Sequence, residues 1–246
     1  MSRTLFAAPG RFVDHALRRA LGCALAAILL GAVPAANAQP ISGGVDLLEV
    51  HVGDGGDHLL MESAFSVGSG LKTITLKVDG GSDTRPTFED LELQGLWMPQ
   101  VSSAVTLAAG IRQDLRAGPN LTHAVAGIEA ALLPWLSAEH YMFLSQRGNL
   151  TGSAKAVLRF PLGKRLTLEP RGEISWAARA ISTEAIGSGA TGMELSMRLR
   201  RSLGSHADLY VGVIHEALVG STAAIARSNG DAVHVTRAVL GLGLKL

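Results

Sequence analysis

Residues 149–179 constrain the fold of this chain more than any other stretch, because apolar and polar side chains alternate along them. Successive side chains on a strand point to opposite faces, so the pattern predicts a β-hairpin with one apolar and one charged face. Each arm holds about 14 residues, more than the usual 5–6 of a globular strand and enough to cross a bilayer at a tilt. The apolar face reads Leu150, Gly152, Ala154, Ala156, Leu158 and Phe160, and then Leu166, Leu168, Pro170, Gly172, Ile174 and Trp176.

The first 38 residues have the composition of an export signal. Four arginines precede an apolar run over 20–33, and Ala36-Asn37-Ala38 is a typical cleavage site. No later apolar stretch approaches the roughly 20 residues of a transmembrane helix. We therefore expect a signal peptide over 1–38, a short N-terminal segment with the first strand and loop over 39–57, and a barrel domain over 58–246.

Removal of this signal changes the charge and the cysteine content of the chain. The signal contains four arginines, Asp14 and the single cysteine, Cys23. The full sequence has 22 basic and 21 acidic residues, so 18 basic and 20 acidic residues remain after its removal. A slightly acidic chain gives no electrostatic case for binding nucleic acid. Without a cysteine, the mature chain has neither a disulfide nor thiol chemistry.

The same alternation recurs about twelve times. Polar and apolar residues alternate most clearly over 101–115 and 190–203, and least clearly over 43–51 and 120–132. The expected strands are 43–51, 58–68, 70–80, 86–97, 101–115, 120–132, 135–146, 149–162, 165–179, 190–203, 206–219 and 231–246.

The connections between these strands favour a membrane barrel over a soluble sandwich. Every second connection is short, near 68–70, 98–100, 133–134, 161–164 and 204–205, while most of the others, such as 180–189 and 220–230, are longer and polar. Short turns on one side and longer loops on the other are typical of outer-membrane barrels. We therefore predict an all-β fold, a transmembrane antiparallel up-and-down barrel of about twelve strands, with ten as the alternative, in the outer membrane of a Gram-negative cell.

An ordered set of short motifs resembles the copper resistance protein B family. Gly110-Ile111-Arg112-Gln113-Asp114 is similar to that family's G-x-R-x-D strand, and the segment 165–173 to its R-L-x-L-x-P-R-x-E. Further matches, in family order, are Leu133-Pro134-Trp135, Ile186-Gly187-Ser188-Gly189, Glu194-Leu195, Tyr210-Val211-Gly212-Val213 with Glu216, and Ala226-Arg227 with Gly230-Asp231.

The resemblance implies an outer-membrane barrel that binds or transports copper ions and takes part in copper resistance and homeostasis. Its partners would be outer-membrane lipid, copper ions and a periplasmic copper-binding protein or oxidase. Members of the family often carry a Met/His/Asp-rich N-terminal segment, whereas residues 39–44 contain no such tract. The alternatives are a small porin or structural barrel without metal handling, and a lipid-modifying outer-membrane enzyme.

The polar faces of the predicted strands carry many charges that would share the lumen. One interpretation is an ion-paired filling that keeps the barrel rigid, because isolated buried ions are expensive to desolvate. The other is a path along which acidic groups and water pass a cation. The predicted lumen charge network is Glu62, Arg112, Asp114, Glu169, Arg171, Glu173, Glu194, Arg198, Arg200 and Glu216.

One predicted outer loop groups residues that could bind copper at the surface. His51, Asp54, Asp57 and His58 lie within eight residues, and copper accepts imidazole and carboxylate ligands. Glycine and aspartate are also ordinary turn formers, so a plain loop is the alternative. The sequence has no C-x-x-C, H-E-x-x-H or P-loop motif, and we expect no enzyme; Ser221 or Ser228 with His234 is a weak catalytic candidate.

Overall fold

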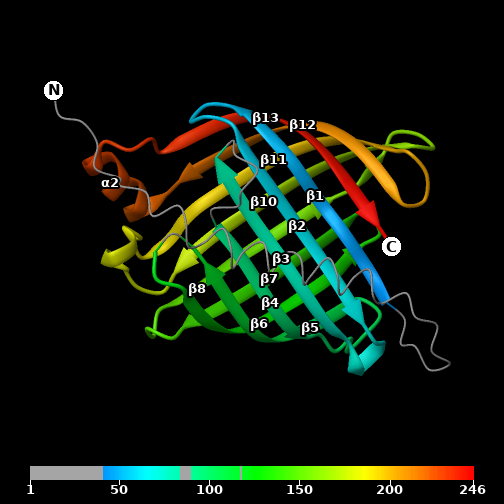
Figure 1. The fold of residues 1–246 in the computed structure, drawn as a ribbon, viewed down its shortest axis with the longest axis horizontal. Helices are drawn as coiled ribbons and strands as arrows, with labels where there is room; N and C mark the ends of the chain where they lie inside the picture. Colours follow the sequence, from blue (N-terminus) through cyan, green and yellow to red (C-terminus); the bar gives the residue numbers. More distant parts are fainter. Residues whose placement is uncertain (1–40, 84–89, 117) are drawn as a thin grey trace, which may run out of the picture.

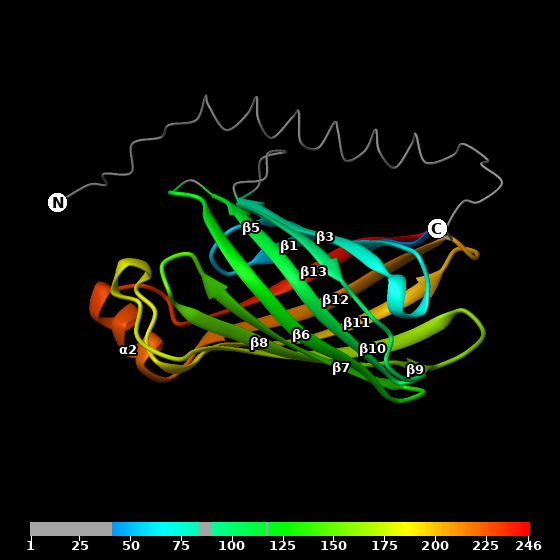
Figure 2. The ribbon, with the colours of Figure 1, turned by 90° about the horizontal axis from the view of Figure 1, so that it is seen from below.

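The computed structural model describes residues 41–83, 90–116 and 118–246, so the expected signal peptide lies outside the described residues. Within these ranges, thirteen antiparallel strands form one sheet, and its last strand pairs with its first. The sheet therefore closes into a barrel with steeply tilted strands (Figures 1 and 2). The strands are β1 (Ile41–Gly53), β2 (His58–Val67), β3 (Ile74–Asp83), β4 (Asp90–Trp97), β5 (Val105–Leu115), β6 (Leu121–Leu133), β7 (Leu136–Ser145), β8 (Leu150–Leu158), β9 (Phe160–Pro161), β10 (Leu166–Ala177), β11 (Gly189–Ser202), β12 (Ala207–Leu218) and β13 (His234–Lys245).

The barrel wall has twelve strands that run its full height, because β8 and β9 are two parts of one interrupted strand. Val157 pairs with Arg171 and Phe160 with Leu168, so the register is unchanged across the interruption. The interruption is at Arg159, opposite Glu169, and next to it Leu158 lies opposite Pro170, which has no N–H to donate to the ladder. The twelve-strand prediction is therefore confirmed, and the expected strand 149–162 differs from the structure only by this gap.

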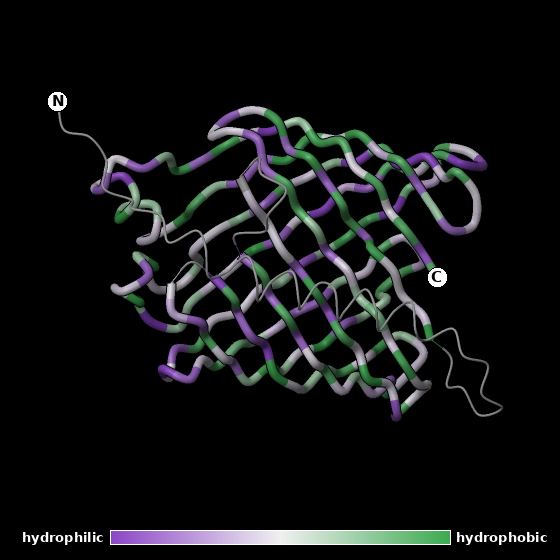
Figure 3. The backbone as a smooth tube through the Cα atoms, viewed as in Figure 1, coloured by the Kyte–Doolittle hydropathy of each residue, from purple (hydrophilic) through white to green (hydrophobic). Residues whose placement is uncertain are grey.

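Each strand has one face inside the barrel and one face outside. On β12, Leu209, Val211 and Val213 are 46–53% exposed, whereas Tyr210 and Ile214, on the other face, are each 2% exposed. The hydropathy of the chain alternates along each strand in the same way (Figure 3). An apolar outer surface and a polar interior are the reverse of a soluble sheet and are typical of a transmembrane barrel.

The two ends of the barrel differ. Gly44 pairs with Lys245, so the beginning of β1 and the end of β13 lie at the same end of the barrel, here called the termini end. The opposite end, here called the loop end, holds the longest described connections, 178–188 and 219–233. The second of these contains the helix α2 (Gly220–Asn229), where the sequence predicted an irregular loop (Figure 1). No helix in the described ranges is long and apolar enough to span a membrane.

Two predicted strands begin later than expected. Residues 70–72 form a 3-10 turn, so the strand predicted from residue 70 begins at Ile74. The strand predicted from residue 101 begins at Val105 because the Ser102 hydroxyl accepts hydrogen bonds from the N–H groups of Ala104 and Val105. Both turns lie at the termini end, where connections 68–73 and 98–104 are longer than predicted.

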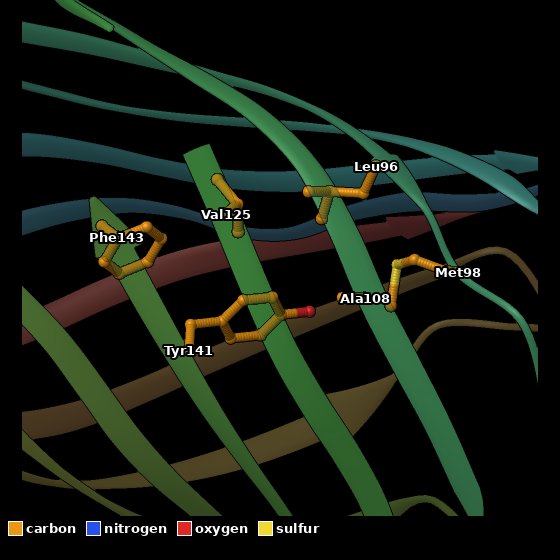
Figure 4. Close-up of a cluster of buried hydrophobic side chains, with 6 residues drawn as sticks. All are labelled: Leu96, Met98, Ala108, Val125, Tyr141 and Phe143. Atoms are coloured by element: carbon orange, nitrogen blue, oxygen red, sulfur yellow. The ribbon is translucent and has the colours of Figure 1, made fainter. Parts of the chain in front are cut away.

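Apolar side chains fill part of the interior. One cluster lines the inner wall of β4–β7 and consists of Leu96, Met98, Ala108, Val125, Tyr141 and Phe143 (Figure 4). A second packs Leu47, Tyr210, Ile214 and Val239 together on the opposite part of the wall. These clusters leave the remaining interior to charged side chains.

Candidate functional site

The interior contains a compact set of ion pairs, here called the arginine cluster: Arg171, Arg198 and Arg200 with Asp46, Glu49, Glu169 and Asp208. Its most buried pair joins β1 to β11, with Arg198 Nε and Nη2 donating to the Glu49 carboxylate at 2.5 and 2.9 Å. The two side chains are 1% and 0% exposed. His51 Nε2 also donates to Glu49, at 2.7 Å. Such a closed, hydrogen-bonded set satisfies the charges that it buries.

The other two arginines of the cluster share one carboxylate. Arg171 and Arg200 both donate to Glu169 Oε1, through bonds of 2.7–2.9 Å. Arg171 Nη2 also donates to Asp46 at 2.7 Å, and Arg200 Nη1 donates to Asp208 at 2.9 Å. The cluster therefore braces the wall formed by β10, β11, β12 and β1 from the inside.

Asp46 reaches this cluster because β1 has a bulge. Val45 pairs with Ser63 and Leu47 with Glu62, so two residues of β1, Asp46 and Leu47, oppose one residue of β2. A bulge breaks the simple alternation of faces. Both side chains consequently lie on the inner side, where Asp46 bonds to Arg171 and Leu47 packs in the second apolar cluster.

A cavity of about 810 Å³ lies in the lumen beside these clusters. Its lining extends from Ser103 and Ala104 near the termini end to Glu184 and Ile186 at the loop end. Among the described residues that line it, nine are acidic and six are Lys or Arg. The cavity is therefore a polar passage with an excess of negative charge, and a narrow space with such walls concentrates cations.

Inward-facing carboxylates, most of which line this cavity, form two rows across neighbouring strands. In the first row Glu62, Asp79, Glu92 and Asp114 are successive cross-strand neighbours from β2 to β5. The second row continues around the wall through Glu129, Glu139, Glu173, Glu194 and Glu216, with Lys155 between Glu139 and Glu173. Because paired residues share a face, all these side chains are directed into the barrel.

Three cations bind most of these carboxylates. Lys77 Nζ lies 2.7 Å from Glu129, and Lys155 Nζ lies 3.4–3.9 Å from Glu62, Glu139 and Glu173. Arg112 lies 2.6 Å from both Glu92 and Asp114. Within the described chain, Asp79 has no ion pair and no hydrogen bond of its own.

The loop end of the cavity is crossed by an ion pair. Arg116, after β5, lies 3.0 Å from Glu184, which belongs to the connection between β10 and β11. Both residues line the cavity. The pair therefore links the connection after β5 to the connection between β10 and β11 at the loop end of the cavity.

Helix α2 docks on the same connection at the motif Ile186-Gly187-Ser188-Gly189, and a second motif noted in the sequence ends the helix. The Gly187 N–H donates to the Thr222 hydroxyl at 2.9 Å, and the Ser221 hydroxyl donates to the Ser188 carbonyl at 3.1 Å. A side chain at Gly187 would lie 2.1 Å from Ser221 Oγ. Gly230 ends the helix in the left-handed conformation, and the N–H of Asp231 donates to the Ala226 carbonyl.

Substitution of Gly187 by valine is therefore expected to undock α2. Overpacking at such a contact costs about 1–3 kcal/mol, and the strain should be relieved locally by the loop rather than by the barrel. Trypsin cleavage at the exposed Arg227 should become faster in the folded protein. Gly163→Val is the control, because a side chain there meets nothing; equal cleavage of both variants would contradict the docking role.

The structure places the predicted metal ligands on two strands and a turn. His51 and His58 are direct cross-strand neighbours on β1 and β2, and His51 already bonds to Glu49. Asp54 accepts the N–H of Thr236, and its carbonyl accepts from Arg237. Among the described residues no group of three or more His, Cys, Asp or Glu could hold a metal ion. The two histidines are thus together, while the four-residue site stays a prediction.

All ten residues of the predicted lumen charge network lie on the inner wall. They are divided between the arginine cluster, the two carboxylate rows and the ion pair of Glu216 with Arg237. The sequence analysis missed Lys77, Asp79 and Glu92, although alternation in β3 and β4 carries the signal. It also missed Asp46, whose inward direction depends on the bulge.

The weak catalytic candidates do not form a nucleophilic set. The hydroxyls of Ser221 and Ser228 donate to the backbone carbonyls of Ser188 and Ile225. The ring of His234 lies edge-on against His215, with centroids 6.2 Å apart. Neither hydroxyl is bonded to an imidazole, as nucleophilic activation would require.

Comparison with known proteins gives one family and one fold. The family model described as copper resistance protein B precursor (CopB) matches residues 41–245. A copper resistance protein B homolog of Pseudomonas syringae pv. tomato is 30% identical over 199 residues, which cover 81% of this chain and 67% of that protein. Copper resistance protein B of Escherichia coli is 31% identical over 174 residues, 68% of this chain and 56% of that protein.

Solved structures with a similar fold are small porins. The KdgM porin superposes with a TM-score of 0.53 at 13% identity, covering 82% of this chain and 99% of the porin. The NanC porin gives 0.55 at 9% identity, covering 82% and 100%. At such identities the likeness concerns the fold alone, which is that of an outer-membrane barrel.

Proposed function

The chain belongs to the copper resistance protein B family, and on that premise we propose that it contributes to copper tolerance by binding copper ions and moving them through the barrel lumen at the outer membrane. Copper is the cargo in this proposal and not a resident cofactor. A periplasmic copper-binding protein or oxidase would exchange the ion with the termini end of the barrel.

The acidic cavity is the observation that carries this proposal. Its lining extends between the two ends of the barrel and holds more carboxylates than Lys and Arg side chains. In a low-dielectric wall an excess of fixed negative charge raises the local concentration of cations and lowers that of anions. Selectivity filters for cations use rings of Asp and Glu in the same way.

A small porin or structural barrel without metal handling is the second candidate. The arginine cluster favours it, because seven mutually satisfied charges on the inner wall stiffen the barrel without any need for an ion. In that case the cavity would pass small solutes without preference for copper. The two candidates predict different phenotypes.

Loss of the gene is expected to change the growth of its host specifically with copper. A deletion strain should grow as the parent does in ordinary medium and more slowly at copper concentrations that the parent tolerates. The full-length gene on a plasmid should restore tolerance, and nickel or cobalt at equally toxic doses serves as the control. Unchanged copper tolerance together with slower entry of small antibiotics would favour the porin instead.

A further inference from the structure

Asp79 is the carboxylate in the first row that the surrounding cations leave unpaired. Its cross-strand neighbours are Glu62 on β2 and Glu92 on β4. Glu62 lies 3.5 Å from Lys155, and Glu92 lies 2.6 Å from Arg112. In the described chain Asp79 has no such partner, although it lines the cavity between them. Three adjacent carboxylates repel one another unless a positive charge lies close by.

The cations that could approach Asp79 are bound elsewhere. Lys77, two residues before it on β3, donates to Glu129 at 2.7 Å and to the Tyr141 hydroxyl at 2.9 Å. Lys155 lies within 3.4–3.9 Å of three carboxylates at once. Lys77 is therefore held toward the second row, and Lys155 is shared among Glu62 and two carboxylates of the second row, so neither ammonium group pairs with Asp79.

Gln94 gives an independent indication of a ligand at this place. Its side chain is 5% exposed, lines the same cavity and follows Glu92 by two residues on the inner face of β4. Its Nε2 donates to Glu92 Oε1 at 2.6 Å, and because a carboxylate only accepts, this bond fixes the orientation of the amide. The Gln94 Oε1 atom is buried and has no donor. A buried carbonyl oxygen without a partner normally costs stability, and a cation would satisfy it.

The donor atoms select the class of ion. Carboxylate and amide oxygens suit hydrated divalent ions, and Cu(II) accepts oxygen and nitrogen ligands, whereas Cu(I) prefers thiolates and thioethers. The described residues that line the cavity include no Cys and no Met. Since no three acidic or histidine side chains in the described part could close around a metal ion, a passing ion would keep several of its waters. Weak, water-mediated holding suits transit, because an ion must leave as well as enter.

We propose that Glu62, Asp79, Glu92 and the Gln94 carbonyl form a transit site for a hydrated divalent cation, and that their oxygen donors select Cu(II) rather than Cu(I) as the copper ion that passes. The site rests on the proposed function, since it specifies which lumen residues the transported copper ion would contact and which oxidation state the ion would have. Asp79 provides the carboxyl group that no Lys or Arg side chain of the described chain binds, and Gln94 provides a buried neutral oxygen on the neighbouring strand.

The test measures ion entry into vesicles that contain the purified full-length protein. One set of vesicles holds a dye quenched by copper and a second set holds a K⁺-sensitive dye. The initial rate is recorded with Cu(II), with Cu(I) kept reduced by ascorbate, and with K⁺ in the second set. Asp79→Asn removes the charge with little change of shape and is expected to slow Cu(II) entry on the order of 5- to 10-fold, as loss of one nearby unit charge predicts. K⁺ entry should change far less, and Asp79→Glu should restore Cu(II) entry. Asp231→Asn, at the exposed loop end, is the charge-matched control.

The outcomes separate the transit site from the proposed function. If Cu(II) enters vesicles with the unmodified protein no faster than it enters protein-free vesicles, the proposed transport is wrong, and so is the transit site. If it passes Cu(II) and Asp79→Asn does so at the same rate, only the site is overturned. Entry of Cu(I) as fast as Cu(II) overturns the choice of oxidation state. Should Asp79→Asn fail to fold by circular dichroism, Gln94→Leu replaces it, and unchanged Cu(II) entry in that variant contradicts the site.

Discussion

Substitution of Arg198 by alanine is expected to lower the free energy of unfolding by about 3–5 kcal/mol, because it leaves the fully buried Glu49 carboxylate without its cation. His51 also donates to this carboxylate, but one imidazole cannot replace two guanidinium bonds to the same group. The measurement is equilibrium unfolding of the refolded barrel in urea, in lipid vesicles, with tryptophan fluorescence as the readout.

The matched variant removes both charges. Arg198→Met combined with Glu49→Leu replaces the buried pair with apolar side chains of similar size and should be far less destabilised than Arg198→Ala alone. Equal loss in both proteins would mean that packing, and not the uncompensated carboxylate, causes the effect. The comparison therefore isolates the electrostatic part of the arginine cluster.

Substitution of Leu240 by arginine is expected to cost about 2–4 kcal/mol if the outer face of β13 lies in hydrocarbon, as a charge near the bilayer midplane does in barrels. Leu240 is 61% exposed and lies between Val50 on β1 and Val211 on β12, which also face outward. In a water-soluble barrel the same substitution would be close to neutral, since the side chain would simply be solvated.

Leu244 provides the control for this substitution. It lies on the same strand and the same outer face, but four residues nearer to the termini end. Arginine there should cost only about 0–1 kcal/mol, because its charge can reach the headgroups. Unfolding of the two variants in vesicles gives the comparison, and equal costs at the two depths would argue against a membrane around this face.

The architecture could be predicted because it depends on a repeated local property. Alternation of apolar and polar residues decides which face of each strand meets lipid, and it is visible in 101–115 and 190–203 without any knowledge of partners. The inward direction of Arg112, Arg171 and Arg198 follows from the same alternation. The sequence could not tell which carboxylate each arginine binds, since Arg198 and Glu49 are far apart in the chain and meet only when the barrel closes.

The features that escaped prediction depend on local departures from the strand pattern. Asp46 faces inward because of the bulge. A bulge adds one residue to the strand, so the alternation of faces before it does not predict the faces after it. The helix α2 has a recognisable end at Gly230, in the left-handed conformation common after helices, yet its loop position favoured an irregular interpretation. Asp79 alternates with apolar residues on β3, but alternation alone does not show which inward carboxylate lacks a cation.

The Glu49–Arg198 pair has a consequence for how the barrel is assembled. The two residues lie on opposite sides of the seam between β1 and β13, and the pair spans β13 and β12 to reach β11. If the seam closed one residue out of register, Glu49 would turn to the lipid and Arg198 would be buried alone, while Asp46 would lose Arg171. The charges inside the lumen thus disfavour closure of the barrel with β1 and β13 one residue out of register.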